Sequence, residues 1–507
     1  MNQQLKAGIY GLSGLCLIAL LLRVDGWLWG ACMLGAACAL WLTLQKTERT
    51  ETKQIPVGQQ VAALILSLCY AGYFASLENF ALWACLLGLL GLPAMWLFVS
   101  KTLHAAMNAL QRPFQSLKYW PWLLILIAGA LYIVVVYHET TMFYRPHFEG
   151  GIRWADRLFT MDTGAVVAEN VWLNPEASEN DFRQPLFALF AMPVSIPLHL
   201  LAQAMPFIPD FYVYSLAVVQ WGMLVLAYAM LCEMLDAAGS RRMCLAVLLG
   251  SYPTMIFMLN MEQYIFGLFW MVAFLYAHHF GFGGRKLLCI AATGSLMTSG
   301  LWEPLVVKPW NWKNWLKETA AALGLALLLI AGSGKLALLE IFEQQTGRYA
   351  SYFGDSSFMD KLLQYVNFIG SCLIAPVTRS HDINGTWRLA SVTALHPAGL
   401  ILLALAIAGV VLNRKMPLVR LCAVWMAFSA VLLLILGWGS AENGMTLYTL
   451  YFGWAFLMPA SLAAWRFTEP LGRWRKWLLG AIGLAVLAVN GVSVLRLLFF
   501  ARRIYPC

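Results

Sequence analysis

Carboxylates and arginines gather in one stretch of the chain, from His138 to Pro185. This stretch contains eight of the 25 Asp and Glu residues of the whole chain. A carboxylate can take a proton from an acceptor hydroxyl as a general base, and an arginine can hold a phosphate through paired hydrogen bonds. Such chemistry suits a transfer from a phosphorylated lipid carrier at a membrane surface. Residue types alone leave one alternative open, because any exposed loop is rich in solvated charge.

The rest of the chain is apolar enough that a bilayer must hold these residues in place. Of 507 residues, 61% are apolar and 12% are charged, and the mean hydropathy is +0.69. Soluble proteins carry about 25% charged residues, so a chain of soluble domains, a coiled coil and a disordered protein are excluded. The excess of 34 Lys and Arg over 25 Asp and Glu fits the positive-inside rule better than a nucleic-acid partner. We predict an all-α, polytopic membrane protein whose partners are membrane lipids and no nucleic acid.

About 20 apolar residues are needed to cross a bilayer as a helix, and that template predicts about 14 transmembrane helices. A short apolar run, 301–307, is expected to form a half-helix that dips into the membrane and returns. The first run lacks a small-residue cleavage site, so it is expected to remain as a span rather than act as a signal peptide. The predicted spans lie near residues 7–22, 27–44, 58–76, 79–99, 120–137, 211–234, 243–259, 263–280, 286–300, 318–332, 398–412, 418–437, 445–464 and 477–499.

The distribution of charge orients these spans. With the N-terminus in the cytoplasm, the inner segments hold 21 of the 34 Lys and Arg residues but only 6 of the 25 acids. This asymmetry is the positive-inside pattern. Two long segments, 138–185 and 333–397, then face outside. Helical periods over Asp156–Val171 and Asp360–Ile374 predict that both are ordered extracytoplasmic loops with membrane-surface helices, and long ordered loops are usually functional.

The order of these features resembles the GT-C class of integral-membrane glycosyltransferases, which use polyprenyl-phosphate-linked sugars. An acidic first outer loop is followed by Arg183-Gln184-Pro185-Leu186-Phe187 and then by a long run of spans. The stretch from Phe159 to Val167 is similar to the catalytic loop of bacterial members, and the Arg-Gln-Pro-Leu-Phe segment is similar to their Arg-His-Pro-Leu-Phe, with Gln184 in place of the histidine. Asn260-Met261-Glu262-Gln263-Tyr264 is similar to their outer-face acidic or amide residue. The resemblance covers roughly residues 118–500.

The resemblance implies roles for residues of the first loop. A loop aspartate acts as the catalytic base in that class, which makes Asp162 the first candidate here and Asp156 the second. The alternative for Asp162 is a helix N-cap, because it precedes Thr-Gly-Ala-Val-Val. Arg183, Arg153 and Arg157 are the candidates for holding the phosphate of the carrier.

Four residues outside the first loop complete the predicted substrate-binding set. Glu262 is expected at the outer end of a span, although it could simply snorkel at the interface. Arg379 and His381 in the second loop could hold a carrier phosphate or belong to a solvated turn. Glu442 lies at another outer span end, where it could line the site or sit in a turn beside an aromatic-belt residue.

No motif requires a cofactor. The loop carboxylates could bind a divalent metal ion, as in some members of the resembled class, but no ligand spacing demands one. Eleven cysteines show no zinc-site spacing. Most lie in apolar runs, so no disulfide framework is predicted.

The sequence thus predicts an inverting membrane glycosyltransferase that moves a hexose or pentose from a polyprenyl-phosphate carrier to a cell-envelope glycan or lipid acceptor. Two alternatives remain: a multi-span transporter or flippase of lipid-linked sugars, and a polysaccharide polymerase or ligase. The expected location is the bacterial cytoplasmic (inner) membrane, with the active site facing outside. The predicted organisation is an N-terminal extension of four spans (1–117), a catalytic membrane module (118–332) that carries the acidic loop, a second outer loop (333–397) and C-terminal spans (398–507).

Overall fold

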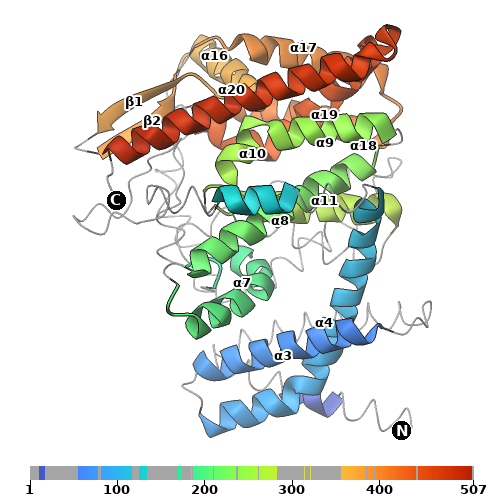
Figure 1. The fold of residues 1–507 in the computed structure, drawn as a ribbon, viewed down its shortest axis with the longest axis vertical. Coiled ribbons are helices and arrows are strands. Elements are labelled where there is room, and N and C mark those ends of the chain that lie inside the picture. Colours follow the sequence, from blue (N-terminus) through green and yellow to red (C-terminus); the bar gives the residue numbers. More distant parts are fainter. Residues whose placement is uncertain are drawn as a thin grey trace.

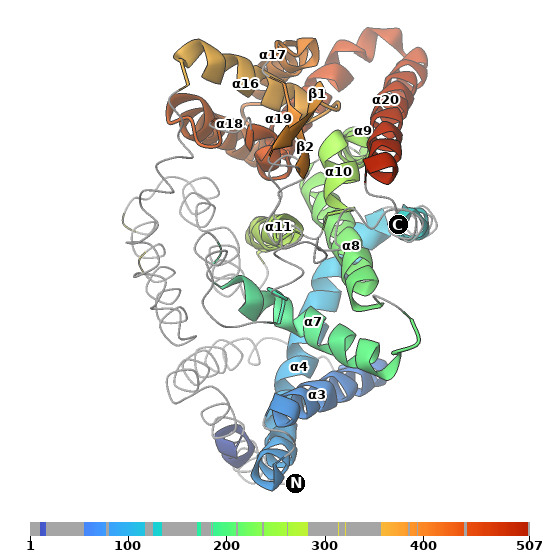
Figure 2. The same cartoon turned by 90° about the vertical axis from the view of Figure 1, so that its left-hand side faces the viewer.

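The computed structural model shows a predominantly helical chain, which confirms the predicted all-α class and adds one β-hairpin to it (Figure 1). The first helices lie at one end of the molecule and the C-terminal helices at the other, with α7 and α8 between them in both views (Figures 1 and 2). The structure describes residues 11–16, 55–77, 81–116, 125–133, 170–173, 184, 186–208, 211–235, 238–260, 262–281, 313, 320, 356–383, 386–392, 394–440 and 444–504.

Two packed helices form the N-terminal end of the molecule. The helices α3 (Val57–Leu77) and α4 (Leu82–Ser116) coincide with the predicted spans 58–76 and 79–99. Helix α4, however, continues through much of the segment 100–119 that was predicted as a cytoplasmic connection. That segment is rich in Ala, Leu, Met, Gln and Lys, which favour helix outside a membrane as well. Pro93 and Pro113 lie inside α4, which changes direction along its length (Figure 1), as a helix does at an internal proline.

Helix α7 (Phe187–Ala204) follows the acidic loop and was not predicted from the sequence. Pro193 and Pro197 interrupt its helical pattern, and each proline removes one backbone N–H. Because residue 197 has no N–H, the carbonyl of Pro193 lacks its usual donor one turn later. The hydroxyl of Tyr70 on α3 donates to that carbonyl at 2.7 Å. Helix α3 therefore supplies a hydrogen-bond donor that α7 itself lacks.

One predicted span, 243–259, is broken into α9 (Ala238–Gly250) and α10 (Tyr252–Phe257). Ser251 between them is extended, and Pro253 lies in the first turn of α10, where proline is well tolerated but cannot continue the preceding helix. The side chain of Asn490, which is fully buried, donates to the freed carbonyl of Gly250 at 2.9 Å. The break is thus satisfied by a residue 240 positions away along the chain.

Helices α8 (Phe211–Glu233) and α11 (Tyr264–Phe280) pack against each other and coincide with two predicted spans. Helix α11 ends at Gly281, whose φ of 73° is the left-handed conformation that commonly terminates helices.

The C-terminal half contains the hairpin and the helices around it. Helix α16 (Phe358–Ser371) confirms the helical period predicted in the second loop, but its second half is buried against other helices rather than lying on a membrane surface. The strands β1 (Thr378–Ile383) and β2 (Thr386–Ser391) pair antiparallel, with Thr378 opposite Ser391. The elements that follow are α17 (Pro397–Leu412), α18 (Pro417–Ser429) with a π-helical continuation (Ala430–Ile435), a 3₁₀ helix (Gly444–Tyr448), α19 (Thr449–Phe467), a 3₁₀ turn (Glu469–Leu471) and α20 (Trp474–Ile504).

The protein is a membrane protein. Within the described ranges, four helical segments are long and apolar enough to cross a bilayer: Phe211–Glu233, Pro417–Ile435, Gly444–Phe467 and Trp474–Phe499. The predicted spans 27–44, 286–300 and 318–332, most of 7–22 and the half-helix at 301–307 lie outside the described residues, as do parts of 120–137.

Burial separates the central helix from the peripheral one. The most apolar stretch of Gly444–Phe467 is 94% buried inside the protein, whereas that of Trp474–Phe499 is only 11% buried. Helix α19 therefore forms the middle of the core, and α20 presents most of its surface to the surroundings. Lipid tails are as apolar as leucine side chains, so the hydrophobic effect does not drive helices together inside a bilayer. Helices there associate through close packing instead. Such close packing joins α17 and α19, where Gly409 lies against the backbone of Pro459.

Candidate functional site

The structure describes the side chain of one predicted site residue, Glu262. Arg379 and His381 are placed by backbone only, in β1, where they pair with Ala390 and Arg388. The remaining candidates lie outside the described residues: Asp156, Asp162, Arg153, Arg157, Arg183 and Glu442. Their predicted roles therefore remain predictions.

Glu262 lies in the short connection between α10 and α11 and is only 4% exposed. Its carbonyl accepts a hydrogen bond of 2.8 Å from Nε2 of Gln220 on α8, and its own N–H donates to the carbonyl of Asn260 at 3.0 Å. The Asn260 amide donates in turn to the carbonyl of Ile256 at 2.8 Å. A snorkelling side chain would sit at the protein surface, so this burial favours a residue held inside the protein.

Gln184, at the end of the acidic loop, is joined to the Glu262 region through α19. Its Nε2 donates to the hydroxyl of Tyr451 at 2.8 Å, and the ring of Tyr451 lies 4.7 Å from that of Tyr264, centroid to centroid. A second contact joins the same two segments, because the rings of Phe187 and Phe266 are 5.4 Å apart. The Arg-Gln-Pro-Leu-Phe segment and the Asn260–Tyr264 segment, which are 73 residues or more apart in sequence, therefore meet in space.

Three buried amides around this contact have unpaired polar atoms. Within the described part of the chain, Oε1 of Gln184, Oε1 of Gln220 and Nε2 of Gln263 have no hydrogen-bond partner. The three side chains are 0–7% exposed, and buried polar groups are nearly always hydrogen-bonded. The atoms are thus available to the hydroxyls of a bound molecule or to neighbouring protein groups. Together with the Glu262 carboxylate, they give this region a set of donors and acceptors suited to a polar ligand.

Two residues of this contact, Gln220 and Tyr451, were not predicted as site residues from the sequence. Gln220 is a polar residue within the long apolar run of α8. A polar residue in such a run is a weak sign that this side of the helix faces polar neighbours. Tyr451 carries no distinguishing signal, because it is one of several aromatic residues near the start of α19.

The described piece of the acidic loop is a turn, Asn170–Leu173, anchored on α7. Asn170 adopts a left-handed φ of 48°, and the N–H of Leu173 donates to its carbonyl at 2.8 Å. The hydroxyl of Ser195 donates to the carbonyl of Trp172 at 2.7 Å. Asn170 and Val171, the last two residues of the helical period predicted over Asp156–Val171, thus lie in a turn, and the rest of that stretch lies outside the described residues. The indole of Trp172 also packs against Phe187, with ring centroids 6.1 Å apart, which ties the turn to the start of α7.

The described residues include no group of three or more His, Cys, Asp and Glu side chains that could hold a metal ion. The acids of the first loop that could do so, Asp156 and Asp162 among them, lie outside the described ranges. Cys232, Cys244, Cys372 and Cys422 are buried and free of disulfides. They pack as small apolar residues.

Comparison with known proteins gives no match: no protein family, no curated protein and no solved structure is similar to the chain.

Proposed function

We propose that this protein is a membrane glycosyltransferase of the GT-C type. It takes a sugar from a polyprenyl-phosphate carrier and transfers it, with inversion, to a cell-envelope glycan or lipid acceptor at the outer face of a bacterial cytoplasmic membrane. The observation that carries the proposal is the contact of Gln184 with Tyr451, which in turn packs on Tyr264. Through it, the end of the acidic loop meets the buried turn of Glu262, two segments that the resemblance to the GT-C class assigns to one site.

The loop residues supply the chemistry in this proposal. Asp162 takes the proton of the acceptor hydroxyl, and the oxygen attacks the anomeric carbon of the donor sugar. The bond between that carbon and the phosphate oxygen breaks, and the carrier leaves as polyprenyl phosphate. Arg183, with Arg153 and Arg157, balances the phosphate charge that grows as the carrier leaves, because guanidinium groups pair bidentately with phosphate oxygens.

In this proposal the buried amides form hydrogen bonds with the uncharged sugar groups of the substrates. Gln184 and Gln220 offer acceptor oxygens, and Gln263 offers a donor nitrogen, none of them with a partner in the described part of the chain. Sugar hydroxyls both donate and accept, so they can satisfy all three atoms. A ligand that pairs buried polar groups gains selectivity, since an analogue that lacks a hydroxyl leaves them unpaired.

The proposal is tested by reconstituting the purified protein in liposomes with a radiolabelled polyprenyl-phosphate hexose and membrane extract as the source of acceptor. Asp162→Asn should lower the transfer rate by about 10²–10⁴-fold, the usual effect of losing a general base. If Asp162 were only an N-cap, Asn would replace it with little loss, because both residues cap well. Asp156→Asn is the matched control, and Arg183→Ala should weaken donor binding. Full activity of both Asn variants and of the double variant would refute the glycosyltransferase.

One observation favours the alternative of a transporter or flippase. Transporters bind substrates where helices are interrupted and keep ionisable residues inside the bundle, and here the break at Ser251 is followed by the buried Glu262. The same liposomes separate the two functions. A flippase would move the labelled lipid to the other leaflet without forming a new glycosidic bond, whereas the transferase consumes it.

A further inference from the structure

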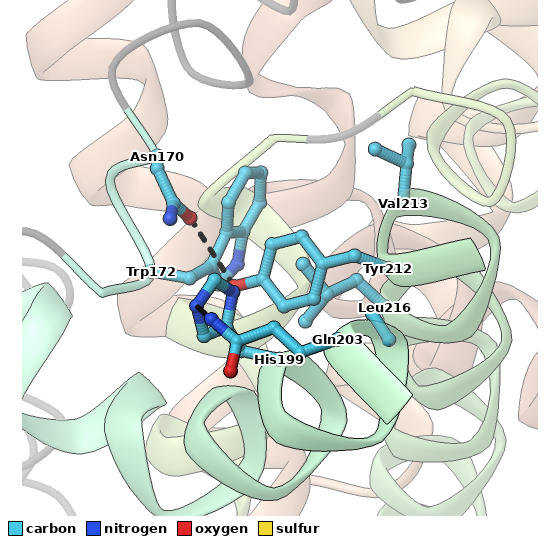
Figure 3. A pocket seen from close by; sticks show the side chains of 8 residues that line it. Asn170, Trp172, His199, Gln203, Tyr212, Val213 and Leu216 are labelled. Carbon is cyan, nitrogen blue, oxygen red and sulfur yellow. Dashed lines mark hydrogen bonds between the residues drawn. The ribbon is translucent and has the colours of Figure 1, made fainter. Parts of the chain in front are cut away.

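A pocket of about 390 Å³ lies where the Asn170–Leu173 turn meets α7 and the start of α8 (Figure 3). Its size is within the range of small-molecule sites. Polar and aromatic side chains from all three elements line it: Asn170 and Trp172 from the turn, His199 and Gln203 from α7, and Tyr212 from α8. The remaining lining is aliphatic. The pocket therefore combines apolar walls with a few converging polar groups, which is the usual composition of a ligand site.

The polar side chains of the pocket are fixed by one another yet keep atoms for a ligand. The hydroxyl of Tyr212 donates to Oδ1 of Asn170 at 3.2 Å, which leaves the amide nitrogen of Asn170 to donate. Nε2 of Gln203 donates to Nε2 of His199 at 3.0 Å, which leaves the amide oxygen of Gln203 to accept. Trp172 is 1% exposed, and its indole N–H has no partner among the described residues. Figure 3 shows these side chains converging on one space.

The described lining of the pocket is uncharged, which favours an uncharged ligand. The described residues of the lining include no Lys, Arg, Asp or Glu, and an imidazole that accepts at Nε2 is neutral. These described side chains therefore offer no counter-charge to a phosphate or a carboxylate. Uncharged amides and an indole N–H suit hydroxyl groups. The Tyr212 and His199 rings, packed edge to face with centroids 5.5 Å apart, offer apolar surface to the C–H face of a sugar ring.

The pocket also lies beside the candidate site. Trp172 packs on Phe187, and Phe187 packs on Phe266, four residues after Glu262. Asp162 lies eight residues before Asn170, so the chain between them spans at most about 29 Å. A sugar bound in the pocket is thus held on the same loop as the predicted base.

We propose that this pocket binds one neutral sugar ring of the acceptor glycan. The inference rests on the proposed glycosyltransferase function and names its acceptor class. The donor sugar is a less suitable occupant, because its carrier phosphate would need a cation and the described lining residues supply none.

Binding is tested apart from catalysis by saturation-transfer NMR on the full-length protein in nanodiscs, with methyl glycosides of glucose, galactose, mannose and N-acetylglucosamine as probes. At least one glycoside should bind to the wild-type protein. Asn170→Gly keeps the left-handed backbone that glycine adopts freely and removes the amide, and Gln203→Ala removes an exposed side chain. Each should weaken binding about five- to tenfold, the effect of one lost hydrogen bond. Gln111→Ala, an exposed glutamine on α4 outside the pocket, should leave it unchanged.

Three outcomes would overturn the pocket assignment: no glycoside binds, the two pocket variants bind as well as the wild type, or decanol displaces the sugar and thereby marks a lipid-tail pocket. In the transfer assay, Asn170→Gly should raise KM for the acceptor and leave KM for the donor unchanged. A rise for the donor alone would overturn the acceptor role. Glycoside binding by a protein that transfers no sugar would refute the transferase and leave the pocket as a saccharide site.

Discussion

The hydroxyl of Tyr70 on α3 donates to the carbonyl of Pro193 on α7 at 2.7 Å. The carbonyl needs this donor because residue 197, one turn later, is also proline and has no N–H. The N-terminal helices thus stabilise the helix that supports the saccharide pocket.

This relationship predicts the effect of Tyr70→Phe. The variant loses one hydroxyl and should destabilise the protein by about 1 kcal/mol, the usual net contribution of one hydrogen bond, because Pro193 is exposed at the protein surface. The measurement is the midpoint of thermal unfolding in detergent micelles. Pro197→Ala restores the backbone donor, so in the double variant the loss caused by Tyr70→Phe should largely disappear. Equal losses from Tyr70→Phe with and without Pro197 would show that the bond contributes nothing.

Replacing Asn490 should lower the stability of the protein more, because its one side chain forms hydrogen bonds with three backbone groups. Its Nδ2 donates to the carbonyls of Gly250 and Leu373 at 2.9 and 2.8 Å, and its Oδ1 accepts from the N–H of Ala375 at 2.9 Å. Asn490→Leu keeps the volume and removes the partner of the Gly250 carbonyl and of the Ala375 N–H, while the Leu373 carbonyl keeps only the Tyr252 N–H at 3.2 Å. The variant should therefore cost about 3 kcal/mol of stability. Ser493→Ala, three residues on, removes only an exposed bond to its own helix and should change stability by less than about 0.5 kcal/mol.

A side chain at Gly409 should have a steric effect on the close contact between α17 and α19. A Cβ at Gly409 would lie 1.9 Å from the carbonyl oxygen of Pro459, so Gly409→Ala must push α17 and α19 apart. We expect a loss of about 1–3 kcal/mol, as for other overpacked cores. Gly480→Ala on α20 is the matched control, because nothing lies within 4 Å of its Cβ. There the higher helix propensity of alanine should leave stability unchanged or slightly raised. Similar unfolding midpoints for the two variants would argue against this close contact.

The charge asymmetry predicts that the loops 138–185 and 333–397 face the same, outer side. In a protein with its native cysteines replaced, Pro175→Cys and Asp355→Cys should both react with a membrane-impermeant maleimide in intact cells. Thr50→Cys, in a predicted cytoplasmic segment, should react only after permeabilisation. Labelling of the two loop positions from opposite sides would contradict the topology.

Hydropathy predicts helices well where a run of about 20 apolar residues is unbroken, as in α3, α8, α11 and α20. It fails where a proline interrupts the run and a residue distant in sequence pairs the backbone carbonyl that the proline leaves without a donor. In α7, Tyr70 supplies a donor to the carbonyl that Pro197 leaves without one. The predicted span 243–259 breaks before Pro253, and Asn490 pairs the carbonyl of Gly250 that the break frees. Neither partner can be inferred from a local pattern.

The candidate site likewise depends on a contact between distant residues that no local sequence pattern reveals. The sequence marks Gln184 and the Asn260–Tyr264 segment through their resemblance to short motifs, but Tyr451, which joins them, lies 267 residues from Gln184. Only the packing of α19 against α11 brings it there. A pair so far apart carries no periodicity, and the residue types involved are common in membrane helices.

The contact of Gln184 with Tyr451 yields the last prediction. In the resembled class a histidine stands at the position of Gln184, and an imidazole can also donate to the Tyr451 hydroxyl. Gln184→His should therefore retain most of the transfer activity, whereas Gln184→Leu, of similar volume, should lose about tenfold or more through misplacement of the acidic loop. Tyr451→Phe removes the hydroxyl that accepts from Gln184 and should reproduce the loss.

Folding must be separated from catalysis in this series. Unfolding midpoints are measured beside kcat and KM for all three variants, because a purely structural bond would lower the midpoint by the equivalent of about 1–3 kcal/mol and leave kcat of the folded fraction unchanged. If Gln184 positions the loop, kcat falls in Gln184→Leu and Tyr451→Phe, and the double variant is little worse than either single one, because both act on the same bond. Additive losses in the double variant, or an inactive Gln184→His that folds normally, would place the two residues in separate roles.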